Sequence, residues 1–543
     1  MNRDRKVDFA NIPKTSRLFL DFLHDFSKVQ RFFPNPYSLD QFRKETLGSS
    51  CQLSHREELC GILERQNRTF GAGERTFEHL QKLRDSDCWA VVTGQQVGLF
   101  TGPAYTIYKA LTAVKLAAHY ACRGLKAVPV FWMATEDHDL VEVSECFLVD
   151  ADSQPRQIHY SPETTQQRES VGRVAFSEGI QASLAEFLSL LPNSEFKEEF
   201  LVRLRMAYSP GKTFASAFGE VFSYLASNYG LILLDPQDEG LKNLARPMLE
   251  SILLRSQELN TATESQSQLL LQSGYHSQVI LDKESVGLFF EDGGKRRGLI
   301  HDGDRIRPKG HEPVLARQDW QRLVQSRPWQ FSPNVLFRPV VQDYLLPTLA
   351  YVAGPSEIAY LAQTRGLYDE LGRKMPIIFP RVSVSIIERK IAKILEKYRL
   401  NFEDVFLGSE ALIKKIVEQT MDQSLSERFS AIEIDFTKKL GELENSLRSV
   451  DPTLGEALKT TQQKVQYQVS HLRAKFVAAE TRQQEVTTKQ IEKALAVLFP
   501  LKTLQERRLN VFYFLSRYGM DFLAQLYEEI DLTDPDHHLM QIG

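Results

Sequence analysis

Glycines, neutral amides and a lysine are concentrated in the segment TGQQVGLFTGPAYTIYK (93–109). The segment lies between an apolar run and a helical pattern, the position at which open α/β sheets bind ligands. Its glycines permit close approach to the backbone, free N–H groups at a helix start favour phosphate or carboxylate, and Lys109 adds a cation. The segment matches neither GxGxxG nor the P-loop pattern. A ligand site and a strained structural turn both fit it, and the glutamine pair favours the site. Its other candidate ligand-binding residues are Thr93, Gly94, Gln95, Gln96, Thr101, Gly102, Tyr105 and Thr106.

Five titratable side chains crowd into TEDHDLVE (135–142), which follows a second apolar run. Such a cluster could bind an amine, hold Mg²⁺, or orient His138 as a general base. The alternative is a solvated acidic turn that caps a helix. A position beside the first segment, across a parallel sheet, favours a functional site. The spacing matches no transition-metal pattern, so zinc is not expected. The candidate site residues here are Glu136, Asp137, His138 and Asp139.

Two later segments add weaker candidates. In RPVVQDYLLPTLAYVAGPSEIAY (338–360), polar residues flank an apolar run and a Gly-Pro loop, and in FPRVSVS (379–385) an arginine and two serines precede a helical pattern. Neither segment identifies a site by itself. Their candidate residues are Gln342, Asp343, Gly354, Glu357, Tyr360, Arg381 and Ser383.

The elements that must position these residues follow an α/β pattern. Residues 88–94 and 127–133 are short buried-strand patterns, and a helical apolar period between them covers 104–123. Strand, glycine turn, helix and strand within about 45 residues form a βαβ unit, hence a parallel sheet with a right-handed crossover. A further helix at 214–228 and a strand at 231–235 extend this sheet. We therefore expect an α/β core with a parallel sheet over 1–385, with insertions of short strands and turns near 150–205 and 275–335.

A long helical region follows the core, beginning with VSVSIIERKIAKILEKY (382–398). Apolar residues from Phe429 to Val450 are spaced by three and four, a less regular seam follows, and Asp451-Pro452 separates the two. This pattern predicts an antiparallel coiled-coil hairpin within an arm over 386–500. The alternative is an ordinary bundle packed on the core, which the long polar flanks disfavour. We expect the apolar C-terminal segment, 501–543, to form a helix that packs back on the core.

Composition excludes several classes of protein. Of the 543 residues, 42% are hydrophobic and 25% are charged, and the net charge of −4 does not give the basic field of a general nucleic-acid binder. No apolar run approaches the ~20 residues that cross a bilayer, and the charged N-terminus does not resemble a signal peptide. The five cysteines form no CxxC pair, and His537 and His538 stand in a polar tail without further ligands. We expect a cytoplasmic protein with reduced thiols and no structural metal, membrane or nucleic-acid partner.

Together, the four segments resemble the BshC family of bacillithiol biosynthesis. The similar stretches are TGQQVGLFTGPAYTIYK, PVFWMATEDHD, RPVVQDYLLPTLAYVAGPSEIAY and FPRVSVSIIER, and the late coiled coil also matches. The resemblance implies a Rossmann-like core related to class I aminoacyl-tRNA synthetases and nucleotidylyltransferases, with connecting-peptide insertions. It also implies a helical arm that pairs two subunits, and it adds Trp132 to the candidate binding residues.

The implied reaction joins cysteine to glucosaminyl-malate through an amide bond, after activation of the cysteine carboxylate by ATP with Mg²⁺. Lys109 would then suit a phosphate or carboxylate, and His138 would accept the proton of the amine. The carboxylates, Asp137 among them, would suit an ammonium or sugar hydroxyls. The alternatives are another amide ligase or nucleotidyl transferase on the same core, and a non-catalytic, dimeric nucleotide-binding scaffold. The polar density of the two loops argues against the scaffold.

Overall fold

The structure is a computed structural model that describes residues 6–37, 39, 53–162, 169–280, 282–420, 423–483 and 485–543. The chain divides into two compact units. The first contains the chain up to Ile386 together with Thr503–Met540, and the second contains Ile387–Lys502 and Gln541–Gly543.

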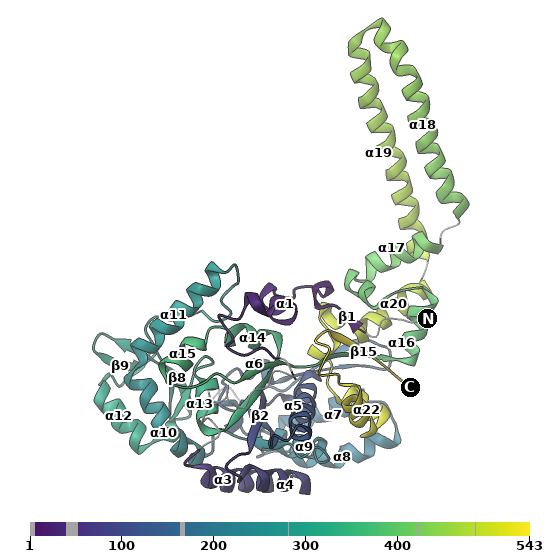
Figure 1. The fold of residues 1–543 in the computed structure, drawn as a ribbon. Helices are drawn as coiled ribbons and strands as arrows, with labels where there is room; N and C mark the ends of the chain where they lie inside the picture. Colours follow the sequence, from purple (N-terminus) through teal and green to yellow (C-terminus); the bar gives the residue numbers. More distant parts are fainter. Residues whose placement is uncertain are drawn as a thin grey trace. The chain divides into compact units, whose positions relative to one another are not determined.

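A parallel sheet of five strands forms the centre of the first unit (Figure 1). Its order is β13-β12-β2-β3-β6, and all neighbouring strands are parallel. The strands are almost entirely buried, as expected for a sheet covered on both faces. The fold is therefore Rossmann-like α/β, as predicted. The strand bounds are β2 Trp89–Gln95, β3 Ala127–Met133, β6 Ile232–Leu234, β12 Thr348–Ala353 and β13 Ile377–Pro380.

Helix α5 (Tyr105–Cys122) is the crossover between β2 and β3, so the predicted βαβ unit is confirmed with small shifts at the ends. Its inward face, including Ala113 and Leu116, packs in one apolar cluster with Trp89 and Val91 of β2. Helices α3 (Arg56–Thr69) and α4 (Glu74–Leu83) cover β6 and β3. The Asn67 side chain of α3 pairs with both backbone groups of Leu233, which satisfies the edge of the sheet.

The first insertion is mostly helical. The prediction of short strands and turns over 150–205 holds only at its start, where β4 (Glu145–Val149) pairs with β5 (Pro155–His159). Helices α7 (Gly179–Leu190) and α8 (Glu195–Ala207) follow, and α9 (Phe214–Leu225) leads to β6. In α7 the buried residues Ile180, Leu184 and Phe187 recur at helical spacing, a period that the sequence reading missed.

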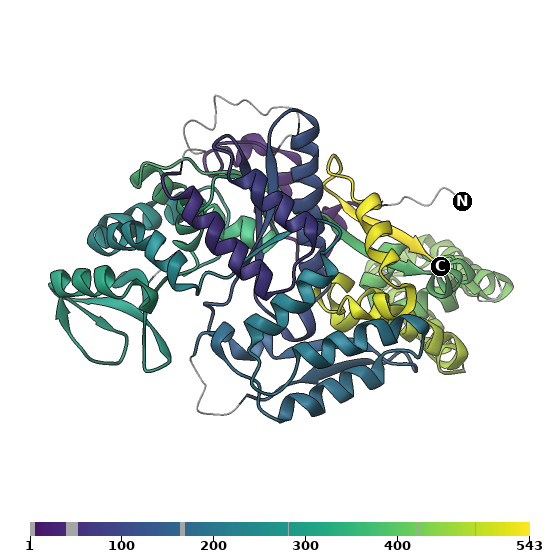
Figure 2. The same ribbon diagram turned by 90° about the horizontal axis from the view of Figure 1, so that it is seen from below.

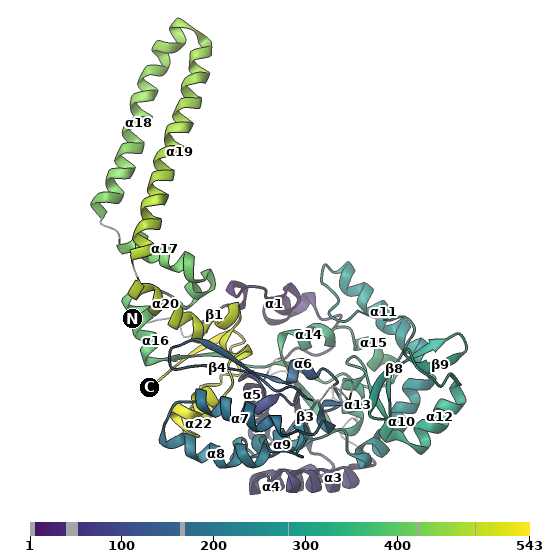
Figure 3. The ribbon, with the colours of Figure 1, turned by 180° about the vertical axis from the view of Figure 1, so that it is seen from behind.

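The second insertion contains an antiparallel sheet with the order β10-β9-β8-β7-β11. Helices α10 (Glu239–Leu254) and α11 (Ser256–Gln272) precede it, and α12 (Arg317–Ser326) lies between its last two strands. Figures 2 and 3 show this sheet and the helices α7, α8 and α9 on different sides of the first unit. The strands are β7 Ser285–Asp292, β8 Lys295–Asp302, β9 Arg305–Pro308, β10 Leu315–Ala316 and β11 Phe331–Pro333.

Between this insertion and the C-terminal half of the central sheet lies α13 (Arg338–Leu345), and α14 (Pro355–Leu361) and α15 (Arg365–Glu370) separate β12 from β13. The prediction of a helix from 382 is wrong for its first part, because Ser383–Glu388 is strand β14 and α16 begins at Arg389. β14 lies beside β15 (His537–Ile542) in a small sheet, where its β-branched residues are buried.

The second unit contains the predicted coiled-coil hairpin. Helices α18 (Gln423–Val450) and α19 (Pro452–Gln483) pack against each other and are joined at Asp451, so the turn is confirmed (Figures 1 and 3). The rings of Phe429 and Phe476 meet across the seam with centroids 6.3 Å apart. The remaining helices of this unit are α16 Arg389–Lys397, α17 Ser409–Thr420 and α20 Glu485–Leu498.

The C-terminal part of the first unit is not a single helix. It contains α21 (Phe512–Tyr518), α22 (Asp521–Glu529) and most of β15. β15 also pairs with β1 (Lys6–Val7).

Candidate functional site

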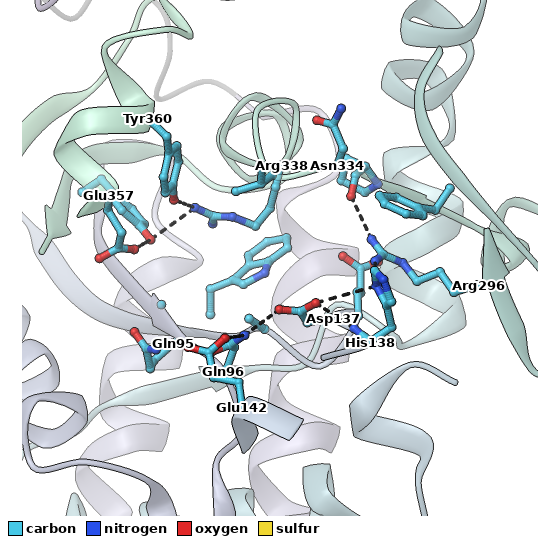
Figure 4. A pocket seen from close by; sticks show the side chains of 18 residues that line it. Gln95, Gln96, Asp137, His138, Glu142, Arg296, Asn334, Arg338, Glu357 and Tyr360 are labelled. Carbon is cyan, nitrogen blue, oxygen red and sulfur yellow. Dashed lines mark hydrogen bonds and ion pairs between the residues drawn. The ribbon is translucent and has the colours of Figure 1, made fainter. Parts of the chain in front are cut away.

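A cavity of about 470 Å³ lies at the carboxyl edge of the central sheet (Figure 4). The chain continues from β2 to β3 and β6 on one side and from β12 to β13 on the other, so β2 and β12 flank the topological switch point. The two loops that the sequence analysis singled out meet here, and the second insertion supplies another wall. The lining residues are Gly94, Gln95, Gln96, Trp132, Ala134, Glu136, Asp137, His138, Glu142, Phe289, Arg296, Pro333, Asn334, Val335, Arg338, Tyr351, Glu357 and Tyr360.

Gly94 is the last residue but one of β2 and lies where no side chain fits. A Cβ there would lie 2.9 Å from the backbone oxygen of Trp132 on the neighbouring strand. The glycine thus lets the strand ends approach closely and brings Gln95 and Gln96 to the cavity edge.

Lys109 lies behind the cavity wall, with 1% of its side chain exposed. Its ammonium donates to the Gly94 backbone oxygen, to Gln95 Oε1 at 3.2 Å and to Glu357 Oε2 at 2.6 Å. These three acceptors match the three protons of the ammonium. The sequence analysis predicted that Lys109 contacts an anionic ligand. In the structure its ammonium group instead donates to three oxygen atoms of the protein.

Glu357 connects this lysine to the wall. Its carboxylate also accepts from the Gly354 N–H at 2.8 Å, at the start of α14, and from the Tyr351 hydroxyl at 2.8 Å. Burial opposes ionisation of Glu357, but the Lys109 ammonium and the Gly354 N–H outweigh it and hold the pKa of Glu357 below its ordinary value. Burial lowers the pKa of Lys109, and Glu357 opposes that shift.

Two arginines face the cavity, Arg296 buried and Arg338 partly exposed. Arg338, at the start of α13, donates to Gln342 Oε1 at 2.8 Å and to the hydroxyls of Tyr360 and Tyr351 at 2.9 and 3.2 Å. Arg296, on β8, is 7% exposed and contacts only neutral acceptors. Within the described part of the chain, neither guanidinium lies within 4.0 Å of a carboxylate oxygen. Neither arginine therefore has a direct carboxylate partner among the described residues.

The acidic segment separates into ligand-facing and structural carboxylates. Gln96 Nε2 donates to Asp137 Oδ2 at 2.6 Å and to Glu142 Oε2 at 2.9 Å, which holds two carboxylates side by side. Glu136 instead pairs with buried Lys242, and Asp139 accepts from the Glu142 N–H at the start of α6 (Leu140–Val143). Four members of the predicted cluster, Glu136, Asp137, His138 and Glu142, thus line the cavity, with the charge of Glu136 paired internally, and the capping alternative is correct for Asp139.

Comparison with known proteins agrees with this architecture. The family model "Bacillithiol biosynthesis BshC, N-terminal Rossmann-like domain" matches residues 6–382, and the corresponding C-terminal coiled-coil domain matches 384–542. The chain belongs to the BshC family. Relatives named "Putative cysteine ligase BshC" include one from Salinibacter ruber, 36% identical over 97% of this chain and 96% of its own length. Another, from Koribacter versatilis, is 35% identical over 99% of both chains.

Several residues predicted for the site of this BshC-family chain lie elsewhere. The start of α5 is covered by the C-terminal segment: the Ala104 N–H donates to the Leu509 oxygen at 2.7 Å, and Asn510 Nδ2 donates to the Gly102 oxygen at 2.8 Å. The predicted anion site at this helix start is wrong, because a distant part of the chain uses its polar groups. Thr93, Thr101 and Thr106 are also buried away from the cavity.

The weaker candidates also separate. Glu357 and Tyr360 line the cavity, whereas Gln342, Gly354 and Tyr105 support lining side chains from behind. Asp343 accepts from Tyr368, and Arg381 and Ser383 contact buried Glu506. His537 is not in a polar tail as predicted: it is fully buried between the hydroxyls of Ser383 and Ser385.

Sequence reasoning missed several lining residues of this BshC-family site. Arg338 begins a segment that was singled out, and its polar neighbours were a usable signal. Arg296 stands in the charged turn GGKRR, which is typical of a solvated hairpin, so nothing local distinguished it. Glu142 belonged to the acidic segment but was not among its candidate site residues, and the other missed lining residues are Ala134, Phe289, Pro333, Asn334, Val335 and Tyr351.

Among the described residues, one group could bring ligand atoms together around a metal ion, namely Asp8, His24 and Asp536. It is not part of the cavity lining, and the Lys6 ammonium lies 3.9 Å from Asp536. No helix in the described part of the chain is long and apolar enough to span a bilayer.

Proposed function

We propose that this protein is a ligase that joins L-cysteine to glucosaminyl-malate by amide-bond formation, the last step of bacillithiol synthesis. Similarity over nearly the full length to relatives named as cysteine ligases supports the reaction class. The observation that carries the proposal is a cavity that contains two arginines without direct carboxylate partners among the described residues, together with the carboxylates of Asp137 and Glu142.

The arginines and the carboxylates of the cavity are complementary in charge to the proposed substrates. Cysteine and the malyl group carry carboxylates, and Arg296 and Arg338 lack carboxylate partners among the described residues. A buried charge without a partner is costly, so an anionic ligand would be stabilised there. Asp137 and Glu142, which Gln96 holds together, suit the ammonium group of the amine substrate.

Activation of the cysteine carboxylate is proposed to use ATP with Mg²⁺, because a free carboxylate does not react with an amine at a useful rate. The unpaired arginines fit a phosphate as well as a carboxylate. Asp137 and Glu142 offer the oxygen ligands that Mg²⁺ prefers. ATP supplies a leaving group on the carboxyl carbon.

We also propose that the protein acts as a homodimer in the cytoplasm, paired through α18 and α19. Apolar residues on this hairpin remain exposed in the single chain, including Ile432 at 46%, Phe436 at 46% and Leu443 at 50%. A second copy of the hairpin would cover such a seam.

A direct assay tests the reaction. The purified protein is incubated with glucosaminyl-malate, cysteine, ATP and Mg²⁺, and the thiol product is identified by mass. We expect product only when all four are present, and a large loss when glucosamine replaces glucosaminyl-malate, because the malyl carboxylates are then missing. ATP turnover without product would instead favour another acceptor and a different amide ligase. Absence of both would favour the non-catalytic scaffold.

A further inference from the structure

The Arg338 guanidinium is held in place by neutral acceptors. Its Nη1 donates to Gln342 Oε1 at 2.8 Å, and its Nη2 donates to the hydroxyls of Tyr360 at 2.9 Å and Tyr351 at 3.2 Å. The Gln342 amide is itself fixed, because its Nε2 donates to Asp343 Oδ1 at 3.0 Å and so turns its Oε1 toward the arginine. A guanidinium has five N–H groups, so the Nε–H and one Nη1–H have no acceptor among the described residues. Arg338 is therefore an oriented cation with donors left for a ligand.

The cavity offers an anion site at Arg338, but no free carboxylate beside it. Glu357 is the lining carboxylate that shares a partner with Arg338: the Tyr351 hydroxyl accepts from Arg338 and donates to Glu357 Oε1 at 2.8 Å. The other Glu357 oxygen accepts from the Lys109 ammonium at 2.6 Å and from the Gly354 N–H at 2.8 Å. The protein thus supplies the donors that this carboxylate needs. A ligand anion would be stabilised at Arg338, whereas a ligand ammonium would find no unpaired charge there.

Arg296 differs, because a carboxylate of the cavity lies beside it. Arg296 Nη1 lies 3.0 Å from His138 Nδ1, and Asp137 Oδ1 lies 3.8 Å from the same nitrogen (Figure 4). The proposed reaction joins an amine nitrogen to a carboxyl carbon, so these two groups have to lie side by side. A carboxyl group on Arg296 and an amine on Asp137 would meet this requirement, and groups on Arg338 and Glu357 would not.

We infer that Arg338 is a specificity-determining residue that binds a carboxylate of the malyl group of the acceptor, whereas the carboxyl group of cysteine reacts beside Arg296. The inference rests on the proposed ligase function, which supplies the two substrates. Cysteine carries an ammonium group on the carbon next to its carboxylate, and the Glu357 carboxylate near Arg338 is already bound by the protein. The malyl carboxylates have no ammonium neighbour, so they suit Arg338 better.

This assignment has a kinetic consequence. The malyl carboxylates take no part in bond formation, so their contact with Arg338 is the same before and during the reaction. Loss of such a contact raises KM and leaves kcat almost unchanged. A hydrogen-bonded contact between charged groups contributes about 10–100-fold in affinity. Glucosamine carries the same amine without a carboxylate and cannot make this contact.

Initial rates with the two acceptors test the assignment. We expect Arg338→Met to raise KM for glucosaminyl-malate by about 10–100-fold, with kcat within about threefold of the parent. With glucosamine the same variant should lose far less, and KM for cysteine and for ATP should not change. Arg338→Lys, which keeps the charge but lacks the planar fork, should lie between the parent and Arg338→Met. Arg297→Met, outside the cavity lining, is the matched control and should behave as the parent.

Three results would overturn the inference. An unchanged KM for glucosaminyl-malate in folded Arg338→Met would show that Arg338 does not contact the acceptor. A raised KM for ATP would assign Arg338 to a phosphate, and a raised KM for cysteine would assign it to the reacting carboxyl group. If Arg338→Met does not fold, as judged by its melting temperature, Arg338→Lys decides among the same three substrates.

A binding measurement does not depend on the reaction. Glucosaminyl-malate is titrated alone, without cysteine or ATP, into the parent and the variants in a calorimeter. We expect its Kd to rise by about 10–100-fold in Arg338→Met and to stay unchanged in Arg297→Met. If the parent makes no thiol product but shows this difference, the proposed reaction fails while the malyl site at Arg338 stands. If the parent makes product and its binding does not depend on Arg338, the reaction stands and the inference fails.

Discussion

Removal of the Lys109 ammonium should destabilise the Rossmann-like unit rather than merely weaken an anionic ligand. In Lys109→Met, the Glu357 carboxylate stays buried and loses the cation that lies 2.6 Å from it. Breaking one side of a buried ion pair costs about 3–5 kcal/mol of unfolding free energy. The double variant with Glu357→Gln leaves no uncompensated charge, so we expect it to recover a large part of that loss.

Tryptophan fluorescence during urea unfolding can measure this cost selectively. The chain has 4 tryptophans, Trp89, Trp132, Trp320 and Trp329, and all lie in the first unit. As a control, Lys126→Met removes a half-exposed lysine paired with surface carboxylates and should change little.

The loss in Lys109→Met should also shrink with acid. The pair keeps the pKa of Glu357 below its ordinary value in the parent, so its contribution is complete above about pH 4.5 and is lost as pH falls through the lowered pKa. Without the Lys109 ammonium, burial favours the protonated form of the Glu357 carboxyl at a higher pH than in the parent. The unpaired buried charge, and the destabilisation that it causes, therefore disappear at a higher pH. An unchanged unfolding midpoint with abolished activity would refute this reasoning and restore Lys109 as a ligand-binding cation.

Three further predictions concern other parts of the chain. Burial lowers the pKa of His537 to about 4, so as the pH falls the unfolded state binds a proton on this histidine before the folded state does. The free energy of unfolding should therefore fall by about 3 kcal/mol between pH 6.5 and 4, and His537→Gln should lack this pH dependence. Gln96→Ala, which frees two carboxylates, should lower kcat/KM by about 10–100-fold at an unchanged melting temperature, and a falling melting temperature with preserved activity would contradict this. Deletion of 427–497 behind a short linker should give a monomer by light scattering, and an intact protein that is already monomeric at micromolar concentration would exclude the dimer.

The central sheet and the position of the site were predictable because they depend on local patterns. An apolar run ending at Gly94, a helical period and another apolar run specify a βαβ unit, and parallel strands place their loops at one edge. The hairpin of α18 and α19 was likewise predictable from its spacing and the turn at Asp451.

The errors occurred where a polar group finds its partner far along the chain. Lys109 meets Glu357 across 248 positions, and the start of α5 is covered by Leu509 and Asn510. A sequence shows that a lysine follows a glycine loop, but only the fold shows whether a carboxylate or open space faces it.

The contrast between charged groups that have a partner inside the protein and those that do not identifies the groups available to bind a ligand. Lys109, Glu136 and Asp139 have internal partners, and each would be assigned to a ligand from its residue type alone. Arg296 and Arg338 look ordinary in the sequence, yet they lie on the cavity, and neither contacts a carboxylate among the described residues. Because a buried charge is stable only when it is compensated, the groups that the protein leaves uncompensated define what the ligand must supply. A ligand with carboxylates for the two arginines and an amine for Asp137 satisfies that requirement, which makes the pairing of charges a stronger guide to this site than the density of polar residues.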